Sequence, residues 1–268
     1  MRLSEGGSLV WRSLGRHPLI ASAVFVALAG TIPPLRVGIG LLLAAAPQTR
    51  PALPFLVSQL VTATIVLTVV VALGWSSAVG LRARPRVDRI IIALAALQLI
   101  AVATVLLLPG SSSTGVTLLP VDVLVIAFLA VAGAITEEVA YRGVLLSALT
   151  VRGETSAAVW STAAFALAHL ANELSNPLLG VLRGVHALGM GALLAAIRVR
   201  SGSLWPGIVV HAVSDMLALA GAIVWYVSGT VALVAILFFV IVSYRVGIAV
   251  ISGGRQEPAL PPVSTALG

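Results

Sequence analysis

Residues 134–142 have the sequence Ala-Ile-Thr-Glu-Glu-Val-Ala-Tyr-Arg and lie in the middle of a long apolar segment. The length and apolar character of the segment predict a helix that crosses a membrane. A charged side chain at the centre of a bilayer costs about 2.5 to 3.5 kcal/mol on insertion scales, so an ionisable residue there indicates a functional site. Two adjacent carboxylates and an arginine therefore make this helix the first place to look for function.

The composition of the whole chain is that of an integral membrane protein. Of its 268 residues, 59% are hydrophobic and 9% are charged, whereas soluble domains contain about 25% charged residues. The mean hydropathy is +1.11. The chain has no cysteine, which excludes thiol nucleophiles, disulfides and cysteine metal sites. We therefore expect an all-α fold, a polytopic bundle of transmembrane helices.

Apolar stretches of the length that a bilayer core requires recur about eight times along the chain. They cover residues 18–45, 54–78, 89–108, 119–149, 156–172, 178–197, 204–227 and 230–250. The first is interrupted by Pro33 and Pro34, and the fourth is long enough to project beyond the bilayer.

The net charge of +7 comes from arginines, and most of these lie in the short connections between the expected spans. Connections rich in Arg face the cytoplasm, which predicts a multi-pass protein of the cell membrane with both termini in the cytoplasm. The arginines then explain topology and contact with lipid headgroups, so no nucleic-acid partner is expected. The cytoplasmic side would receive Arg2, Arg12, Arg16, Arg82, Arg84, Arg86, Arg89, Arg152, Arg198, Arg200, Arg245 and Arg255.

The two carboxylates of the fourth span face different ways on a helix. Glu138 and Arg142 are four residues apart, so they share a face and can form an ion pair. Glu137 points about 100° away and has no local cation. A buried ion pair that only fixes helix packing remains an open explanation for Glu138 and Arg142. It does not explain Glu137, whose free carboxylate suits a general base.

Two histidines lie in later apolar spans. His169 follows Phe165 by one helical turn, and a lone buried histidine is often a hydrogen-bonded packing residue. His211 and Asp215 are also one turn apart, so they could satisfy each other as a pair.

Taken together, these histidines and the free carboxylate indicate a site that binds and activates one water. A zinc ion held by Glu137, His169 and His211 is an alternative, because His and Glu are both zinc ligands. The chain lacks the His-Glu-x-x-His motif of zinc proteases.

Three motifs occur in order on separate spans: Glu-Glu-x-x-x-Arg at 137–142, Phe-x-x-x-His at 165–169 and His-x-x-x-Asp at 211–215. This ordered set resembles the CPBP family, the CAAX-processing and bacteriocin-processing (Abi-like) intramembrane glutamate proteases. We accordingly divide the chain into N-terminal transmembrane helices (1–118), a catalytic CPBP-like core (119–227), a last transmembrane helix (228–250) and a disordered tail (251–268).

The resemblance implies a role for each residue of the motifs. Glu137 and His169 would activate the attacking water, while Glu138 and Arg142 would brace that pair. The resemblance also implies a peptide or protein substrate in or at the membrane, including one lipidated near its C-terminus, and no cofactor.

His211 and Asp215 would form the oxyanion site on this resemblance. The family often has Asn where this chain has Asp215. An ionised aspartate cannot donate a hydrogen bond to an oxyanion, so Asp215 must either be protonated or orient His211 as the donor.

Three functions follow from these observations. The first is a metal-independent glutamate endopeptidase that acts inside the membrane. The second is a zinc-dependent protease that uses the same residues as ligands. The third is a non-catalytic membrane scaffold, immunity or regulatory protein of the same fold, because a fold alone does not establish turnover.

Overall fold

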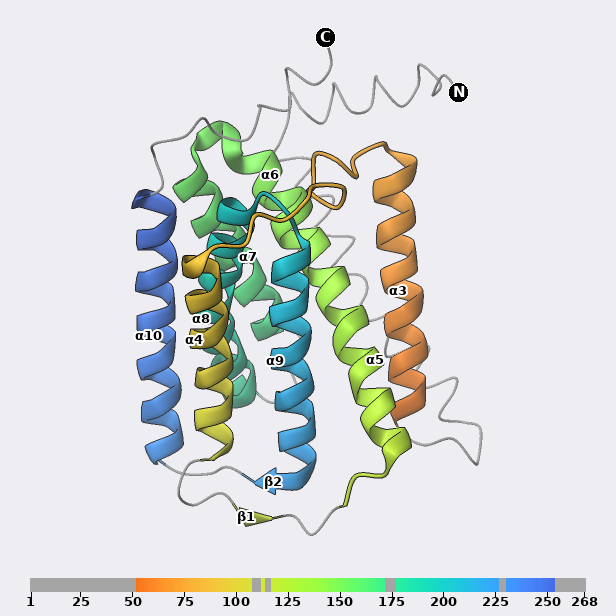
Figure 1. Cartoon of the computed structure of the whole chain (residues 1–268). Helices are drawn as coiled ribbons and strands as arrows, with labels where there is room; N and C mark the ends of the chain where they lie inside the picture. The colour runs from red at the N-terminus through yellow and green to blue at the C-terminus, as the bar shows by residue number, and fades with distance from the viewer. Residues whose placement is uncertain (1–51, 108–111, 114–116, 172–176, 227–229, 254–268) are drawn as a thin grey trace.

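The computed structural model describes residues 52–107, 112–113, 117–171, 177–226 and 230–253. Within these ranges the chain forms a bundle of helices that run roughly side by side (Figure 1). The helices are α3 (Ala52–Ala72), α4 (Arg89–Leu106), α5 (Pro120–Glu137), a π-helix (Glu138–Leu145), α6 (Leu146–Leu149), a 3-10 helix (Thr150–Arg152), α7 (Glu154–Ala171), α8 (Pro177–Ser201), α9 (Trp205–Val224) and α10 (Thr230–Gly253). The expected all-helical class is confirmed, apart from two strands of two residues each.

Three helical segments of the described chain are long and apolar enough to cross a membrane: Pro120–Arg152, Gly180–Ser201 and Val234–Gly253. Shorter apolar helices are Leu56–Ala72, Arg89–Thr104 and Trp205–Gly221. The expected total of about eight spans is therefore not confirmed. The first expected span, 18–45, lies outside the described residues.

Several helix ends differ from the sequence prediction. The span expected at 54–78 ends at Ala72, because the chain turns and Gly74 adopts a φ of 72°, a conformation that glycine permits. The span expected at 204–227 ends at Val224, where β2 (Trp225–Tyr226) pairs antiparallel with β1 (Ser112–Ser113). α10 continues to Gly253, so residues 251–253 are helical and do not belong to a tail.

Local signals explain where two of the helices begin. Asp88 caps α4, with its Oδ1 accepting hydrogen bonds of 3.0 Å from the backbone N–H groups of Ile90 and Ile91. α5 begins with Pro120, and Asp122 Oδ2 accepts a 3.0 Å hydrogen bond from the backbone N–H of Leu119. These polar contacts place the starts of both helices despite their uniformly apolar sequences.

α8 is the most deeply buried helix of the bundle over residues 192–197, whose side chains have no exposed surface. One glycine on each of the two helices allows α8 and α10 to approach closely. A Cβ atom at Gly247 of α10 would lie 2.6 Å from the carbonyl oxygen of Ala192, and one at Gly189 would lie 2.8 Å from the Cα atom of Val240. α8 and α10 therefore pack backbone against backbone, as membrane helices with small residues do.

The connection between α3 and α4 closes one end of the bundle. Gly80 accepts a 3.2 Å hydrogen bond from the backbone N–H of Leu204, and Leu81 accepts one of 2.9 Å from the indole of Trp205. The backbone N–H of Arg86 donates to the carbonyl of Ser201 at 3.1 Å. This network gathers the arginine-rich connection and the turn between α8 and α9 at the same end.

Candidate active site

The helix that carries the paired carboxylates changes its winding between them. Glu137 is the last residue of α5 and Glu138 is the first of the π-helix. Short π-helical segments are rare and frequently mark functional sites. The segment is buried along its whole length, and Ser161 of α7 donates a 2.7 Å hydrogen bond to the carbonyl of Tyr141 within it. The two carboxylates consequently have different surroundings: the Glu137 side chain is 23% exposed and that of Glu138 is fully buried.

Glu138 and Arg142 form the ion pair that their spacing predicts. Arg142 Nη1 lies 3.0 Å from Glu138 Oε1, and neither side chain has exposed surface. α9 approaches the pair through Gly207, where a Cβ atom would lie 3.0 Å from Glu138 Oε2. The absence of a side chain at Gly207 therefore leaves the room that the Glu138 carboxylate occupies.

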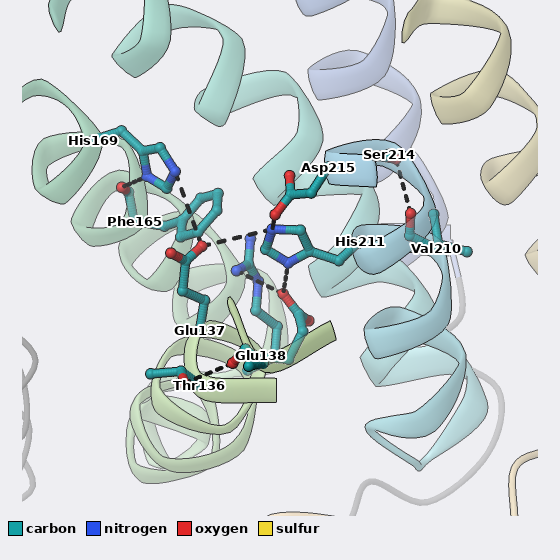
Figure 2. Close-up of polar contacts among 11 residues, drawn as sticks. Thr136, Glu137, Glu138, Phe165, His169, Val210, His211, Ser214 and Asp215 are labelled. Carbon is teal, nitrogen blue, oxygen red and sulfur yellow. Dashed lines mark hydrogen bonds and ion pairs between the residues drawn. The ribbon is translucent and has the colours of Figure 1, made fainter. Parts of the chain in front are cut away.

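His211 is hydrogen-bonded to this ion pair, a contact that the sequence did not reveal. Its Nδ1 lies 3.0 Å from Glu138 Oε1, whereas its Nε2 is 3.5 Å from Asp215 Oδ2 (Figure 2). The second distance exceeds the usual length of an N–H···O bond. Glu138, rather than Asp215, is therefore the residue that orients the His211 ring. The expectation that Glu138 and Arg142 brace the pair of Glu137 and His169 stays a prediction, and the structure adds their contact with His211.

Glu137 lies between the two histidines. Its Oε2 is 3.9 Å from His169 Nε2 and 3.6 Å from His211 Nε2 (Figure 2). These distances are too long for direct hydrogen bonds, so the Glu137 carboxylate is not locked to either ring. His169 Nδ1 is 2.9 Å from the carbonyl oxygen of Phe165. Because a carbonyl only accepts, Nδ1 carries the hydrogen, and the neutral ring then presents its Nε2 lone pair toward Glu137.

Phe165 is fully buried and holds the parts of the site together. Its ring packs edge-on against the rings of His169, His211 and Tyr141, with centroid distances of 4.4, 5.9 and 5.2 Å. The guanidinium carbon of Arg142 lies 4.1 Å from the centroid of the same ring. These contacts fix the histidines and the arginine through aromatic packing and a cation–π interaction.

A second buried arginine lies near the carboxylates. The sequence assigns Arg198 to a cytoplasmic connection, but the structure includes it in α8 with 1% of its surface exposed. A Cβ atom at Gly80 would lie 2.8 Å from its Nη2, and its charge interacts with that of Glu138. Hydropathy does not detect this position because Arg198 lies close to the helix end. Glu138 thus forms an ion pair with Arg142 and interacts electrostatically with Arg198 as well.

The zinc alternative can be compared with this geometry. Glu137, His169 and His211 come together, as the sequence predicts. However, among the residues that the structure describes, no group of three or more His, Asp, Glu or Cys side chains is arranged to hold a metal ion. The side chains as placed do not fit the zinc site.

Fold and site together define an apolar helix bundle that holds a partly exposed carboxylate between two histidines, an arrangement suited to hydrolysis. Residues 119–217 match the model of the family described as Type II CAAX prenyl endopeptidase Rce1-like. The resemblance inferred from the three motifs is thereby confirmed, since the match covers the segment that contains all three. No curated protein matches the chain.

Proposed function

We propose that the protein is an intramembrane endopeptidase that hydrolyses a peptide bond of a membrane-associated peptide or protein, including one lipidated at its C-terminus. The observation that carries this proposal is the position of Glu137. Its carboxylate is partly exposed and lies within 4 Å of the Nε2 atoms of both His169 and His211. A general base must reach the proton that it removes, directly or through one water, and the partial exposure of Glu137 beside two histidines supports this role.

The first step of the reaction is attack by a water held between Glu137 and His169. The Glu137 carboxylate takes one proton of this water while His169 Nε2 accepts a hydrogen bond from it. The water oxygen forms a bond with the substrate carbonyl carbon, and the carbonyl π electrons move to the oxygen. When the tetrahedral intermediate collapses, the C–N bond breaks and the proton on Glu137 passes to the leaving nitrogen. Base catalysis of this kind contributes about 10²- to 10⁴-fold to the rate.

His211 is the proposed donor to the oxyanion. Its Nδ1 is engaged with Glu138, so donation from Nε2 as well requires the imidazolium form. The carboxylates of Glu137, Glu138 and Asp215 all lie within 4 Å of this ring and stabilise its positive charge. A donor aimed at the developing negative charge is commonly the largest single contribution to catalysis of acyl transfer.

The proposed setting is the cell membrane, crossed several times, with both termini in the cytoplasm. The arginine-rich connection and the turn between α8 and α9 share one end of the bundle, and this end is proposed to face the cytoplasm. The partners in this proposal are the peptide or protein substrate and the lipid bilayer.

The experiment that tests the function compares protein termini across the membrane proteome of host cells. Cells express wild type or Glu137→Gln at equal levels, since this change keeps the size of the side chain and removes the base. Glu154→Gln, at the start of α7, is the matched control. We expect new termini in wild type and in the control, and none in Glu137→Gln. Equal termini in wild type and Glu137→Gln would favour the non-catalytic scaffold.

A chelator distinguishes the two protease mechanisms. The metal-independent enzyme should keep its activity when the purified protein is treated with 1,10-phenanthroline. Loss of the Glu137-dependent cleavage, with recovery on addition of zinc, would favour the zinc-dependent alternative.

A further inference from the structure

α3 carries buried polar side chains that the motifs do not include. Ser58, Gln59 and Thr62 are 1%, 6% and 2% exposed in an otherwise apolar helix. The helix lies outside the segment 119–217 that matches the protease family. Burying an amide in apolar surroundings costs free energy unless the amide is hydrogen-bonded, so Gln59 requires an explanation.

Gln59 approaches the active site over a glycine. A Cβ atom at Gly133 of α5 would lie 3.4 Å from Gln59 Nε2 and 4.0 Å from Asp215 Oδ2. Gly133 precedes Glu137 by one helical turn and shares its face. The carboxamide of α3 and the carboxylate of α9 therefore both approach Gly133 of α5, one turn from the proposed base.

The two groups have complementary chemistry. A carboxamide offers two N–H donors and an acceptor oxygen, whereas an ionised carboxylate only accepts. A peptide bond presents one N–H and one C=O to its binding site. Asp215 alone cannot donate to a substrate carbonyl when it is ionised, and Gln59 supplies the donor that is lacking at this place.

We propose that Gln59 is a further residue of the active site, whose carboxamide binds the substrate peptide beside Asp215 and donates the hydrogen bond that a carboxamide at position 215 would otherwise provide. This inference rests on the proposed function. Gly133 contributes by placing no side chain beside the two groups.

The test uses Gln59→Leu, which keeps much of the volume and removes the amide. The readout is the abundance of the Glu137-dependent termini in the membrane proteome, with all variants at equal expression. Loss of a hydrogen bond to the substrate should lower this abundance by about tenfold. Gln98→Leu is the matched control, because Gln98 is another buried glutamine, in α4, whose Nε2 has no hydrogen-bond partner among the described residues. We expect no loss in this control.

A rescue distinguishes a direct role from a structural one. Combining Gln59→Leu with Asp215→Asn returns a carboxamide to the same place and should recover several-fold of the lost cleavage. Gly133→Ala provides a second variant in case Gln59→Leu folds poorly. Alanine favours the helix relative to glycine, so this protein should be at least as stable as wild type while cleaving less.

Three results would overturn the inference: unchanged cleavage by Gln59→Leu, an equal loss in Gln98→Leu, or no recovery in the double variant. Failure of the proposed function is distinguishable from these results, because the termini would then also persist in Glu137→Gln.

Discussion

Replacing Arg142 with methionine would leave Glu138 as a fully buried carboxylate whose remaining hydrogen-bond partner among the described residues is His211 Nδ1, at 3.0 Å. Methionine keeps an unbranched side chain of similar reach, so the change removes the charge with little loss of packing volume. We expect a strongly destabilised protein, because a buried charge that loses its partner is costly.

The magnitude follows from the contacts of the arginine. Breaking a buried ion pair by removing one partner costs about 3 to 5 kcal/mol. The cation–π contact with Phe165 at 4.1 Å adds about 0.5 to 2 kcal/mol. The retained hydrogen bond from His211 offsets part of the loss, so we expect a decrease of about 3 kcal/mol in the free energy of unfolding. This corresponds to a decrease of about 150-fold in the folding equilibrium constant.

The assay is thermal or denaturant unfolding of the purified protein in detergent micelles, applied to a double-mutant cycle. Glu138→Gln combined with Arg142→Met removes both charges together. The double variant should be more stable than Arg142→Met alone, because no carboxylate is left stranded. A loss below about 1 kcal/mol in Arg142→Met, or strictly additive losses in the double variant, would refute the reasoning.

Three further predictions concern other parts of the chain. Asp215→Asn should raise cleavage, measured by the Glu137-dependent termini, since it adds a donor to the oxyanion site; a complete loss would instead show that the negative charge of Asp215 is needed beside the His211 imidazolium. The guanidinium of Arg200 is hydrogen-bonded to Asp88 and lowers the pKa of the Asp88 carboxyl. This pair therefore stabilises the protein at pH values above the pKa that Asp88 has in the unfolded state. The stabilisation is lost as the pH falls through the lowered pKa that Asp88 has in the folded state. Asp88→Asn, which keeps a good cap, should therefore cost about 0 to 1 kcal/mol at pH 7 and nothing at pH values below that lowered pKa, and unfolding curves recorded across pH check this. Gly247→Ala should destabilise the protein by about 1 to 3 kcal/mol in the unfolding assay, whereas Gly253→Ala, where a Cβ would meet nothing within 4 Å, should be neutral.

The contacts predicted from sequence are those that depend on local spacing. The positions of α4, α5 and α7 follow from hydropathy, and the Glu138–Arg142 ion pair follows from four-residue spacing on a helix. The motif order also indicates that the helices bring Glu137 and the two histidines together, which the distances support.

The remaining features depend on contacts between helices that are distant in sequence. The hydrogen bond from His211 to Glu138 joins residues 73 positions apart, so no local period reveals it. Gln59 lies in a helix with no motif, and only the packing of α3 on Gly133 relates it to the site. The π-helix also escapes prediction, because a single widened turn leaves the apolar pattern of the segment nearly unchanged.

The backbone contact between α8 and α10 bears on how this protein can be divided. The three motifs end at Asp215, and the family match ends at residue 217, well before α10 begins at Thr230. Yet Gly247 of α10 rests on the carbonyl of Ala192 in the helix that forms the interior of the bundle. The segment that carries the three motifs is thus shorter than the folded unit, which also includes α10. A fragment cut to the motif-bearing segment would keep the side chains of the three motifs but lose α10, against which α8 packs.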